Sequence, residues 1–258
     1  MKFNKSISIL LILAALGFNA SAGSLLTARG LATKKKKAAA GGFSPSNISG
    51  LKFWLKADAL ALSDGTAVST WPDSSGNGNN ATQSSGALQP IFKAASVNGL
   101  GSVLFDTNSN GMVTSLALTK PFTIFVVEKV NSTGSLRRTI QATSPNNSLI
   151  AVTARTSGAN AYDSGTVSGF RATDATRAHI GRLAIQNSAS SYFCDSIDET
   201  SGATQYNDWG TIGLGYNTWN PEPCGCYVCE IIIYQGVTLS STDFSNVEGY
   251  LRTKWGTP

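Results

Sequence analysis

The sequence predicts an all-β protein in which two antiparallel sheets pack face to face, with one short helix at the C-terminus. Short apolar runs alternate with segments rich in Gly, Ser, Thr and Asn, and only 14% of the residues are charged. Frequent turns and a low charge are typical of all-β chains. About a dozen such runs occur without helices between them, which favours a two-sheet sandwich.

The last strand and helix have the clearest pattern. Residues 226–234 are apolar and β-branched almost without interruption, which predicts a strand buried on both faces. A turn at Gln235 and Gly236 leads into a helix predicted over residues 240–255. Its apolar side chains recur at helical spacing and form one stripe that can pack on a sheet. The stripe consists of Phe244, Val247, Leu251 and Trp255.

Both ends of this helix are marked in the sequence. Ser240 or Ser241 can cap the N-terminus, and Asp243 lies in the first turn, where a negative charge suits the helix dipole. Gly256 and Pro258 end the helix. The pattern therefore predicts a strand, a turn and a helix as the closing unit of the fold.

The earlier strands are less sharply marked. Residues 51–57 alternate between apolar side chains and Lys52 and Lys56, which predicts a half-buried strand with Trp54 on the lysine side. Residues 122–130 form a long apolar run and predict a central strand. The remaining strands are expected at residues 66–71, 101–105, 112–118, 138–142, 148–154, 168–172, 180–185, 191–194 and 211–215.

Residues 72–80 contain only Pro, Asp, Ser, Gly and Asn. Asn and Asp side chains bond to their own backbone in such segments, and Gly adopts positive φ. A calcium-binding loop is the alternative, but the segment offers one carboxylate, Asp73, and lacks the full acidic pattern of an EF-hand. A structural turn is therefore predicted.

The N-terminus has the pattern of a secretory signal peptide over residues 1–22. Two lysines precede the apolar stretch 7–18, and the small residues before Ala22 and Gly23 predict cleavage between these two. An uncleaved anchor is the alternative, but the stretch is shorter than the roughly 20 residues that span a bilayer. We therefore expect an exported protein, secreted or at the cell surface, without a later transmembrane segment.

Residues 23–42 predict a basic flexible linker, because residues 34–37 are four adjacent lysines and little apolar surface accompanies them. A solvated tether is favoured over a patch for anionic polymer. The linker and signal peptide hold seven basic residues and no acid, so the net charge falls from +5 for the chain to −2 for residues 43–258. The length of residues 43–258 is typical of one domain. Their negative net charge lacks the excess of basic residues that is typical of a nucleic-acid-binding domain.

The chain contains four cysteines: Cys194, Cys224, Cys226 and Cys229. In an exported protein these predict disulfides, and we expect one bridge from Cys194 to one of the other three. A zinc site built from all four thiolates is the alternative, but the spacing departs from that of common zinc sites. No metal and no cofactor is predicted.

Several segments resemble the concanavalin A-like, laminin-G-like domain family. The similar segments are residues 53–58 (FWLKAD), 68–83 (VSTWPDSSGNGNNATQ), Pro90, 97–99, 103–106, 230–239 and 247–256. The resemblance covers residues 43–106 and 211–258 and implies a jelly-roll sandwich. That fold is shared by lectins, glycan-binding modules, adhesins, polysaccharide-cleaving enzymes and virion decorations, so it does not select a function. The linker resembles leaders on such domains in phage and prophage structural proteins.

Residues typical of a hydrolase site are not evident in the sequence. Glycoside cleavage needs two facing carboxylates, but the single acidic cluster is Asp195, Asp198 and Glu199, which suits a polar turn. A serine triad needs a histidine, and the single one, His179, is interpreted as a surface or hydrogen-bonded residue. We therefore expect a protein that is not an enzyme, with a polysaccharide hydrolase as the weaker alternative.

A carbohydrate-binding surface is predicted from two aromatic segments next to expected turns. Aromatic rings stack on the apolar faces of sugars, and amides bind hydroxyls. The proposed residues are Tyr206, Trp209, Tyr216, Asn217 and Trp219. The alternative is that both tryptophans fill the edge of the sandwich. We expect glycan or a surface protein as the partner, with a structural role in a virion or extracellular assembly, or a homo-oligomer, left open.

Overall fold

The computed structural model describes residues 42–258 except 107–109, 132–137, 143–148, 156–157, 164–165, 169–175, 187–188, 201–207 and 216–223. The chain divides into the units Met1–Lys36 and Lys37–Pro258, and every described residue lies in the second. The predicted signal peptide, its cleavage site at Ala22 and Gly23, and the linker up to residue 41 lie outside the described residues. No helix within the described ranges is long and apolar enough to cross a membrane.

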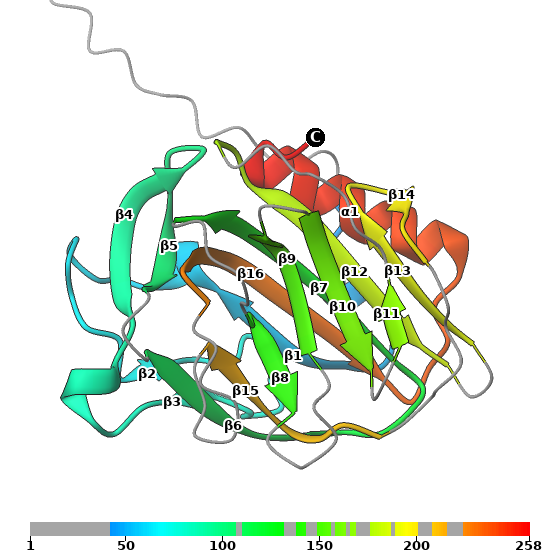
Figure 1. The fold of residues 1–258 in the computed structure, drawn as a ribbon, viewed down its shortest axis with the longest axis horizontal. Helices are drawn as coiled ribbons and strands as arrows, with labels where there is room; N and C mark the ends of the chain where they lie inside the picture. The colour runs from blue at the N-terminus through cyan, green and yellow to red at the C-terminus, as the bar shows by residue number, and fades with distance from the viewer. Residues whose placement is uncertain are drawn as a thin grey trace, which may run out of the picture. The chain divides into compact units, whose positions relative to one another are not determined.

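Two antiparallel sheets form a sandwich, as the sequence predicts (Figure 1). The first sheet has the order β14-β13-β12-β7-β16-β5-β4, and β1 also pairs with β16. Its strands are β1 (Leu51–Lys56), β4 (Ile91–Val97), β5 (Leu100–Phe105), β7 (Phe122–Val130), β12 (His179–Ile185), β13 (Ser190–Cys194), β14 (Ile197–Asp198) and β16 (Cys226–Gln235). The predicted central position of the strand at residues 122–130 is confirmed, because β7 lies between β12 and β16.

The second sheet has the order β11-β10-β9-β8-β15-β6-β3-β2. Its strands are β2 (Thr70–Trp71), β3 (Ala81–Thr82), β6 (Gly111–Leu118), β8 (Ile140–Ala142), β9 (Leu149–Arg155), β10 (Gly158–Asp163), β11 (Thr166–Ser168) and β15 (Gly210–Gly215). Three short 3-10 turns, Pro45–Asn47, Ala57–Ala59 and Gly86–Leu88, precede β1 or join early strands. The helix α1 (Ser241–Trp255) ends the chain.

Some strand boundaries differ from the predictions. The expected strand at residues 66–71 is reduced to Thr70–Trp71, because the backbone of Thr66 and Val68 pairs with the segment around Phe92 outside the regular strands. Strands β3, β4, β10 and β14 have no counterpart among the predicted strands. The strand expected at residues 168–172 meets β11 only at Ser168, and residues 169–172 lie outside the described residues. The residues of β10, GANAYD, include no β-branched side chain, so the sequence gives little local strand preference there.

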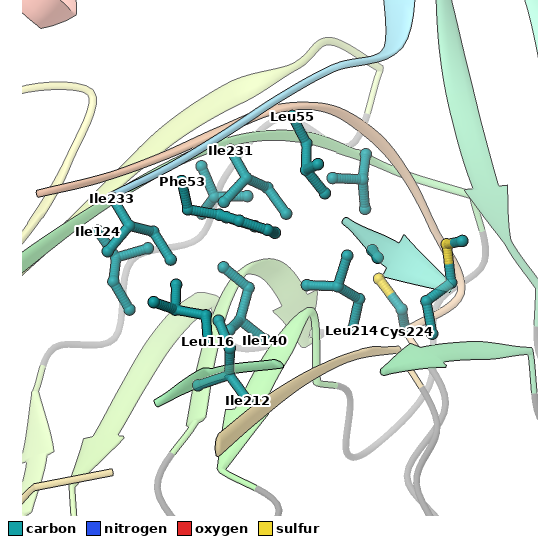
Figure 2. Packing of buried hydrophobic residues seen from close by; sticks show 14 of the residues in the cluster. Phe53, Leu55, Leu116, Ile124, Ile140, Ile212, Leu214, Cys224, Ile231 and Ile233 are labelled. Atoms are coloured by element: carbon teal, nitrogen blue, oxygen red, sulfur yellow. The ribbon is translucent and has the colours of Figure 1, made fainter. Parts of the chain in front are cut away.

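The main core lies between the two sheets (Figure 2). Alternating residues of β1, β7 and β16 point toward the second sheet and meet side chains from β6, β8 and β15. Full burial of each such aliphatic side chain contributes roughly 1.5–3 kcal/mol. The labelled contacts join Phe53, Leu55, Ile124, Ile231 and Ile233 of the first sheet to Leu116, Ile140, Ile212 and Leu214 of the second.

A second core forms between the outer face of the first sheet and α1 (Figure 1). The helix buries Val247, Leu251 and Trp255, and Phe244 packs against the same cluster, so the predicted stripe is confirmed. Strand β16 contributes Ile231 and Ile233 to the main core but Ile232 and Tyr234 to this one. The unbroken apolar run is therefore explained by cover on both faces.

The caps of α1 also follow the prediction. Ser240 is the N-cap, and its side chain accepts a hydrogen bond from the Asp243 backbone while the Asp243 carboxylate accepts one from Ser240. At the other end Gly256 has φ +68°, a conformation that favours glycine. The sequence signals for the start and the end of the helix are both local, and both are correct.

The prediction of a half-buried strand at residues 51–57 is wrong at one position. Trp54 lies on the same side as the lysines, yet it is 8% exposed because it packs with the α1 cluster. Its ring meets the Tyr250 ring edge-on at 6.4 Å, and its indole N–H donates to Glu230 Oε1 at 2.6 Å. The alternating pattern could not show that a helix from the far end of the chain covers this face.

Glu230 in β16 is a fully buried carboxylate that ties α1 to the sheet. Besides Trp54, it accepts hydrogen bonds from the Trp255 indole at 2.7 Å and from the Tyr250 hydroxyl at 2.9 Å. The Lys254 ammonium lies 2.8 Å from Glu230 Oε2 and compensates the buried charge. The three donors on α1 lie within six residues of one another, so Glu230 anchors its last turns.

We predict that the protein loses stability in alkali. Burial and the adjacent Glu230 raise the pKa of Tyr250, and burial raises that of Tyr234. Because the folded pKa values exceed the unfolded value of about 10, the stabilisation is complete below pH 10 and declines as the pH rises above it. Urea unfolding between pH 8 and 11 should show this fall, and Tyr250→Phe should make it shallower. An unchanged free energy of unfolding over that range would contradict the prediction.

Candidate functional site

Trp209 is a core residue and not an exposed sugar platform. It is 0% exposed, and its ring packs edge-on against Phe122 with the centroids 5.4 Å apart. Its backbone N–H donates to the Leu118 carbonyl at 2.9 Å, which continues the pairing of β15 with β6. The alternative that a tryptophan fills the edge of the sandwich is therefore correct for Trp209. The other proposed residues, Tyr206, Tyr216, Asn217 and Trp219, lie outside the described residues.

The two aromatic segments attach to opposite ends of β15. Gly210 pairs with Leu118, and Gly215 pairs with Gly111 at the other end of β6. At about 3.4 Å per residue these ends are roughly 17 Å apart. The segment with Tyr206 therefore joins the strand far from the segment 216–223, and one continuous surface from both is not supported.

Gly215, the last residue of β15 before the segment 216–223, is closely packed. The Gly215 N–H donates to the Thr139 carbonyl at 2.9 Å, and the Gln141 side chain donates to the Gly215 carbonyl. Gly215 has φ +67°, and a Cβ there would lie 2.6 Å from the Asn110 carbonyl oxygen. Only glycine fits this position without a shift of the backbone. The contacts of Gly215 therefore hold the start of the segment in place.

A disulfide directly follows the same segment along the chain. Cys224 and Cys226 are bonded, with their Cα atoms 5.2 Å apart. The distance is normal for a disulfide. The bond fixes the point at which the chain returns to β16, so residues 216–223 start and end at constrained positions.

The predicted bridge from Cys194 is wrong. Cys194 lies in β13, and two strands, β12 and β7, separate it from β16, a distance of roughly 14 Å at about 4.8 Å per strand. Its sulfur instead lies 3.8 Å from Asp195 Oδ2, while Cys229 is a buried free cysteine on the helix side of β16. The four sulfurs therefore do not meet, and the alternative of a four-thiolate zinc site fails for the same reason.

His179 and Asp195 form a buried pair where β12 begins and the turn after β13 follows. His179 Nδ1 lies 2.6 Å from Asp195 Oδ2, and Asp195 Oδ1 accepts the Ile180 backbone N–H at 2.9 Å. The interpretation of His179 as a hydrogen-bonded residue is confirmed. Asp195 and Ser196 both have positive φ and form the tight turn between β13 and β14, whereas Asp198 lies in β14 itself. The prediction of a polar turn is therefore confirmed for Asp195 and wrong for Asp198.

The buried carboxylates of the described residues are engaged by donors. Glu128 accepts the Thr139 hydroxyl, Glu248 lies 2.8 Å from the Arg182 guanidinium, and Glu230 has the four donors named above. A glycosidase acid needs a raised pKa, whereas hydrogen bonds from Thr200 lower the pKa of the exposed Asp198. The buried carboxylates of the described residues, Glu128, Glu230 and Glu248, therefore have structural partners.

The turn at residues 72–80 is structural, in agreement with the sequence. The Asp73 carboxylate accepts backbone N–H groups of Trp54 at 2.9 Å, Ser75 at 2.9 Å and Asn79 at 3.0 Å. These bonds occupy the oxygens that a calcium ion would need. Asp73 therefore joins the turn to β1.

No protein-family model matches the chain, and no curated protein matches it in sequence. Solved structures do match. Domain 4 of AbnA, a GH43 extracellular arabinanase from Geobacillus stearothermophilus, solved with arabinotriose, has a TM-score of 0.57 at 14% identity. The match covers 76% of this chain and 97% of that domain.

Two further enzymes contain a similar sandwich. A GH54 α-L-arabinofuranosidase matches with a TM-score of 0.54 and 15% identity, over 73% of this chain and 51% of the enzyme. Trypanosoma rangeli sialidase matches with a TM-score of 0.52 and 12% identity, over 81% of this chain and 34% of the enzyme.

The chain shares its β-sandwich fold with these domains. At 12–15% identity the likeness concerns the fold, and the chain spans only part of the two larger enzymes. No match identifies the concanavalin A-like family itself, so that resemblance is supported only at the level of the sandwich.

Proposed function

We propose that residues 43–258 form a non-catalytic, concanavalin A-like module that binds carbohydrate and attaches an exported protein to a glycan. The observation that carries this proposal is the likeness to the arabinanase domain, which extends over 97% of that domain and was solved with an oligosaccharide. The match to an entire domain, and not to a fragment of one, favours a module with a comparable role.

The segment 216–223 is the proposed sugar-binding element. It contains Tyr216, Asn217 and Trp219, which supply two aromatic faces and an amide for sugar hydroxyls. Gly215 at its start and the Cys224–Cys226 disulfide at its end restrain the anchor points. Restraint of this kind reduces the ordering cost of binding.

A binding role is favoured over hydrolysis by the environment of the acids. Hydrolysis of a glycoside needs two carboxyl groups that face the bond, one of them protonated. In the described part of the chain, Glu128, Glu230 and Glu248 are buried and hold neighbouring donors. These groups support the fold, and we propose no catalytic residue.

Trp219→Ala should abolish or strongly reduce retention in polyacrylamide gels that contain arabinan, because it removes the largest proposed aromatic platform. The stacking of a nucleobase on an aromatic side chain is worth about 1–3 kcal/mol, and we expect a loss of this order. If the ring binds sugar as proposed and does not pack in the core, the thermal midpoint should stay within about 2 °C of wild type. Trp219→Tyr, which keeps a ring, should retain most of the binding.

Panels of other neutral polysaccharides extend the same measurement. Wild-type protein that no glycan retards would contradict the proposal and favour a structural role in a virion or extracellular assembly. Release of reducing sugar by purified protein would contradict the non-catalytic part.

A further inference from the structure

A hollow of about 200 Å³ lies at the C-terminal end of α1. Its walls come from the β4–β5 turn, the end of β7 and the residues just before β12. Pockets that enclose drug-sized ligands measure roughly 300–1,000 Å³. This hollow therefore suits one sugar unit or one charged group, with the rest of a polymer outside.

The described lining of the hollow is basic. Lys129 and Arg177 contribute two positive charges, and no acidic residue is among the described residues that line it. This contrasts with residues 43–258 as a whole, which carry a net charge of −2. The electrostatic potential at the hollow is therefore positive although the domain as a whole is negative, and this favours binding of an anion.

Lys129 is the decisive residue. Its side chain is half buried on the face of β7 that α1 covers, yet its ammonium makes no ion pair or hydrogen bond with any residue that the structure describes. By contrast, Lys254, Arg182 and Arg252 near the same helix are all paired with carboxylates. A partly desolvated cation without a partner is unfavourable unless a ligand supplies the charge.

The remaining walls suit a sugar ring. Val97, Ala178 and the buried Trp255 provide an apolar floor, and the indole of Trp255 is held by Glu230. The Lys254 carbonyl, where the negative end of the helix dipole would repel an anion, accepts the Asn98 amide at 2.9 Å. The floor is therefore fixed before any ligand arrives, and one source of repulsion is reduced.

We propose that this hollow binds the anionic substituent of an acidic sugar unit, a carboxylate or a sulfate, through Lys129 and Arg177. The inference rests on the proposed glycan binding for the polymer, but the two residues that bind the anion are not among residues 216–223. Arg177 can bind a planar oxyanion through two N–H groups, whereas Lys129 supplies a point charge. The module then distinguishes acidic from neutral polysaccharides.

The test compares Lys129→Gln with a matched variant, Lys93→Gln, which removes the same charge from another half-buried lysine outside the hollow. The probes are sodium polygalacturonate, heparin and neutral arabinan, measured by affinity electrophoresis and calorimetry on the full chain. Lys129→Gln should weaken binding of an acidic polymer roughly tenfold, the effect of one charge-assisted hydrogen bond. Lys93→Gln should leave it unchanged, and neither variant should affect arabinan.

Free galacturonate and sulfate provide the second arm, observed as amide shifts of Ala178 and Gly256 in nuclear magnetic resonance spectra. A dependence on Lys129 with polygalacturonate assigns a carboxylate, and a dependence with heparin but not with polygalacturonate assigns a sulfate. Wild-type binding of arabinan but of no acidic probe overturns this inference and leaves the proposed function intact. Pocket shifts with galacturonate without retention by any polymer support the anion site and overturn the proposed glycan module. Equal affinity of Lys129→Gln and wild type for every acidic probe overturns the anion site.

Discussion

Glu230→Ala should lower the free energy of unfolding by about 3–5 kcal/mol, the usual cost of removing one partner from a buried ionic network. The substitution leaves the indole N–H groups of Trp54 and Trp255 and the Tyr250 hydroxyl without their acceptor. It also leaves the Lys254 ammonium, whose side chain is 13% exposed, with Asp58 as its remaining carboxylate partner. Each unsatisfied buried group adds its own desolvation penalty.

Urea and thermal unfolding measure this effect. A domain of this size should lose about 10 °C in its midpoint, at roughly 2–4 °C per kcal/mol. Glu230→Gln keeps one acceptor and the shape of the side chain, so its loss should be smaller. A midpoint for Glu230→Ala within 2 °C of wild type would show, by the same scaling, that the carboxylate does not anchor α1.

Trp209→Ala should also cost about 3–5 kcal/mol, because a fully buried aromatic ring is replaced by a cavity next to Phe122. Trp209→Phe preserves most of the edge-on contact and should cost less. The decisive comparison is with Trp219→Ala, which is expected to lose glycan retention and keep its stability. The same residue type should thus have opposite effects at the two positions.

Chemical denaturation and affinity electrophoresis on the same preparations make this comparison. If Trp209→Ala keeps wild-type stability and loses glycan retention, the assignment of Trp209 to the core is wrong. If both alanine variants keep retention and only Trp209→Ala is destabilised, the fold assignment holds and the sugar platform does not.

The closing strand and helix could be read from the sequence because their signals are local. A run of apolar β-branched residues indicates cover on both faces of β16, and α1 shows its stripe and both caps within 17 consecutive residues, 240–256. The two-sheet sandwich follows from the density of turns and short apolar runs. Strand β10, which has no β-branched residue, and the two-residue strand β14 were not predicted, because pairing with neighbouring strands holds them in the sheet.

The candidate site was less predictable. Trp209 and Trp219 stand in similar Tyr-Asn-x-Trp contexts, so composition could not separate them. One signal was present: Trp209 immediately precedes the run 210–215, whose strand pairing carries its side chain into the core. The positive hollow was not visible either, because Lys129 and Arg177 come from segments that only the pairing of β7 with β12 brings together.

The sequence alone determined the all-β class, the apolar central strands, the structural turn at residues 72–80 and the capped terminal helix. Each depends on residues within one element, where periodicity and caps act locally. The tertiary structure alone decided which cysteines pair, where Trp209 lies and which donors surround Glu230. These depend on strand order, because Trp54, Glu230 and Trp255 are distant along the chain and meet only where β1, β16 and α1 pack together.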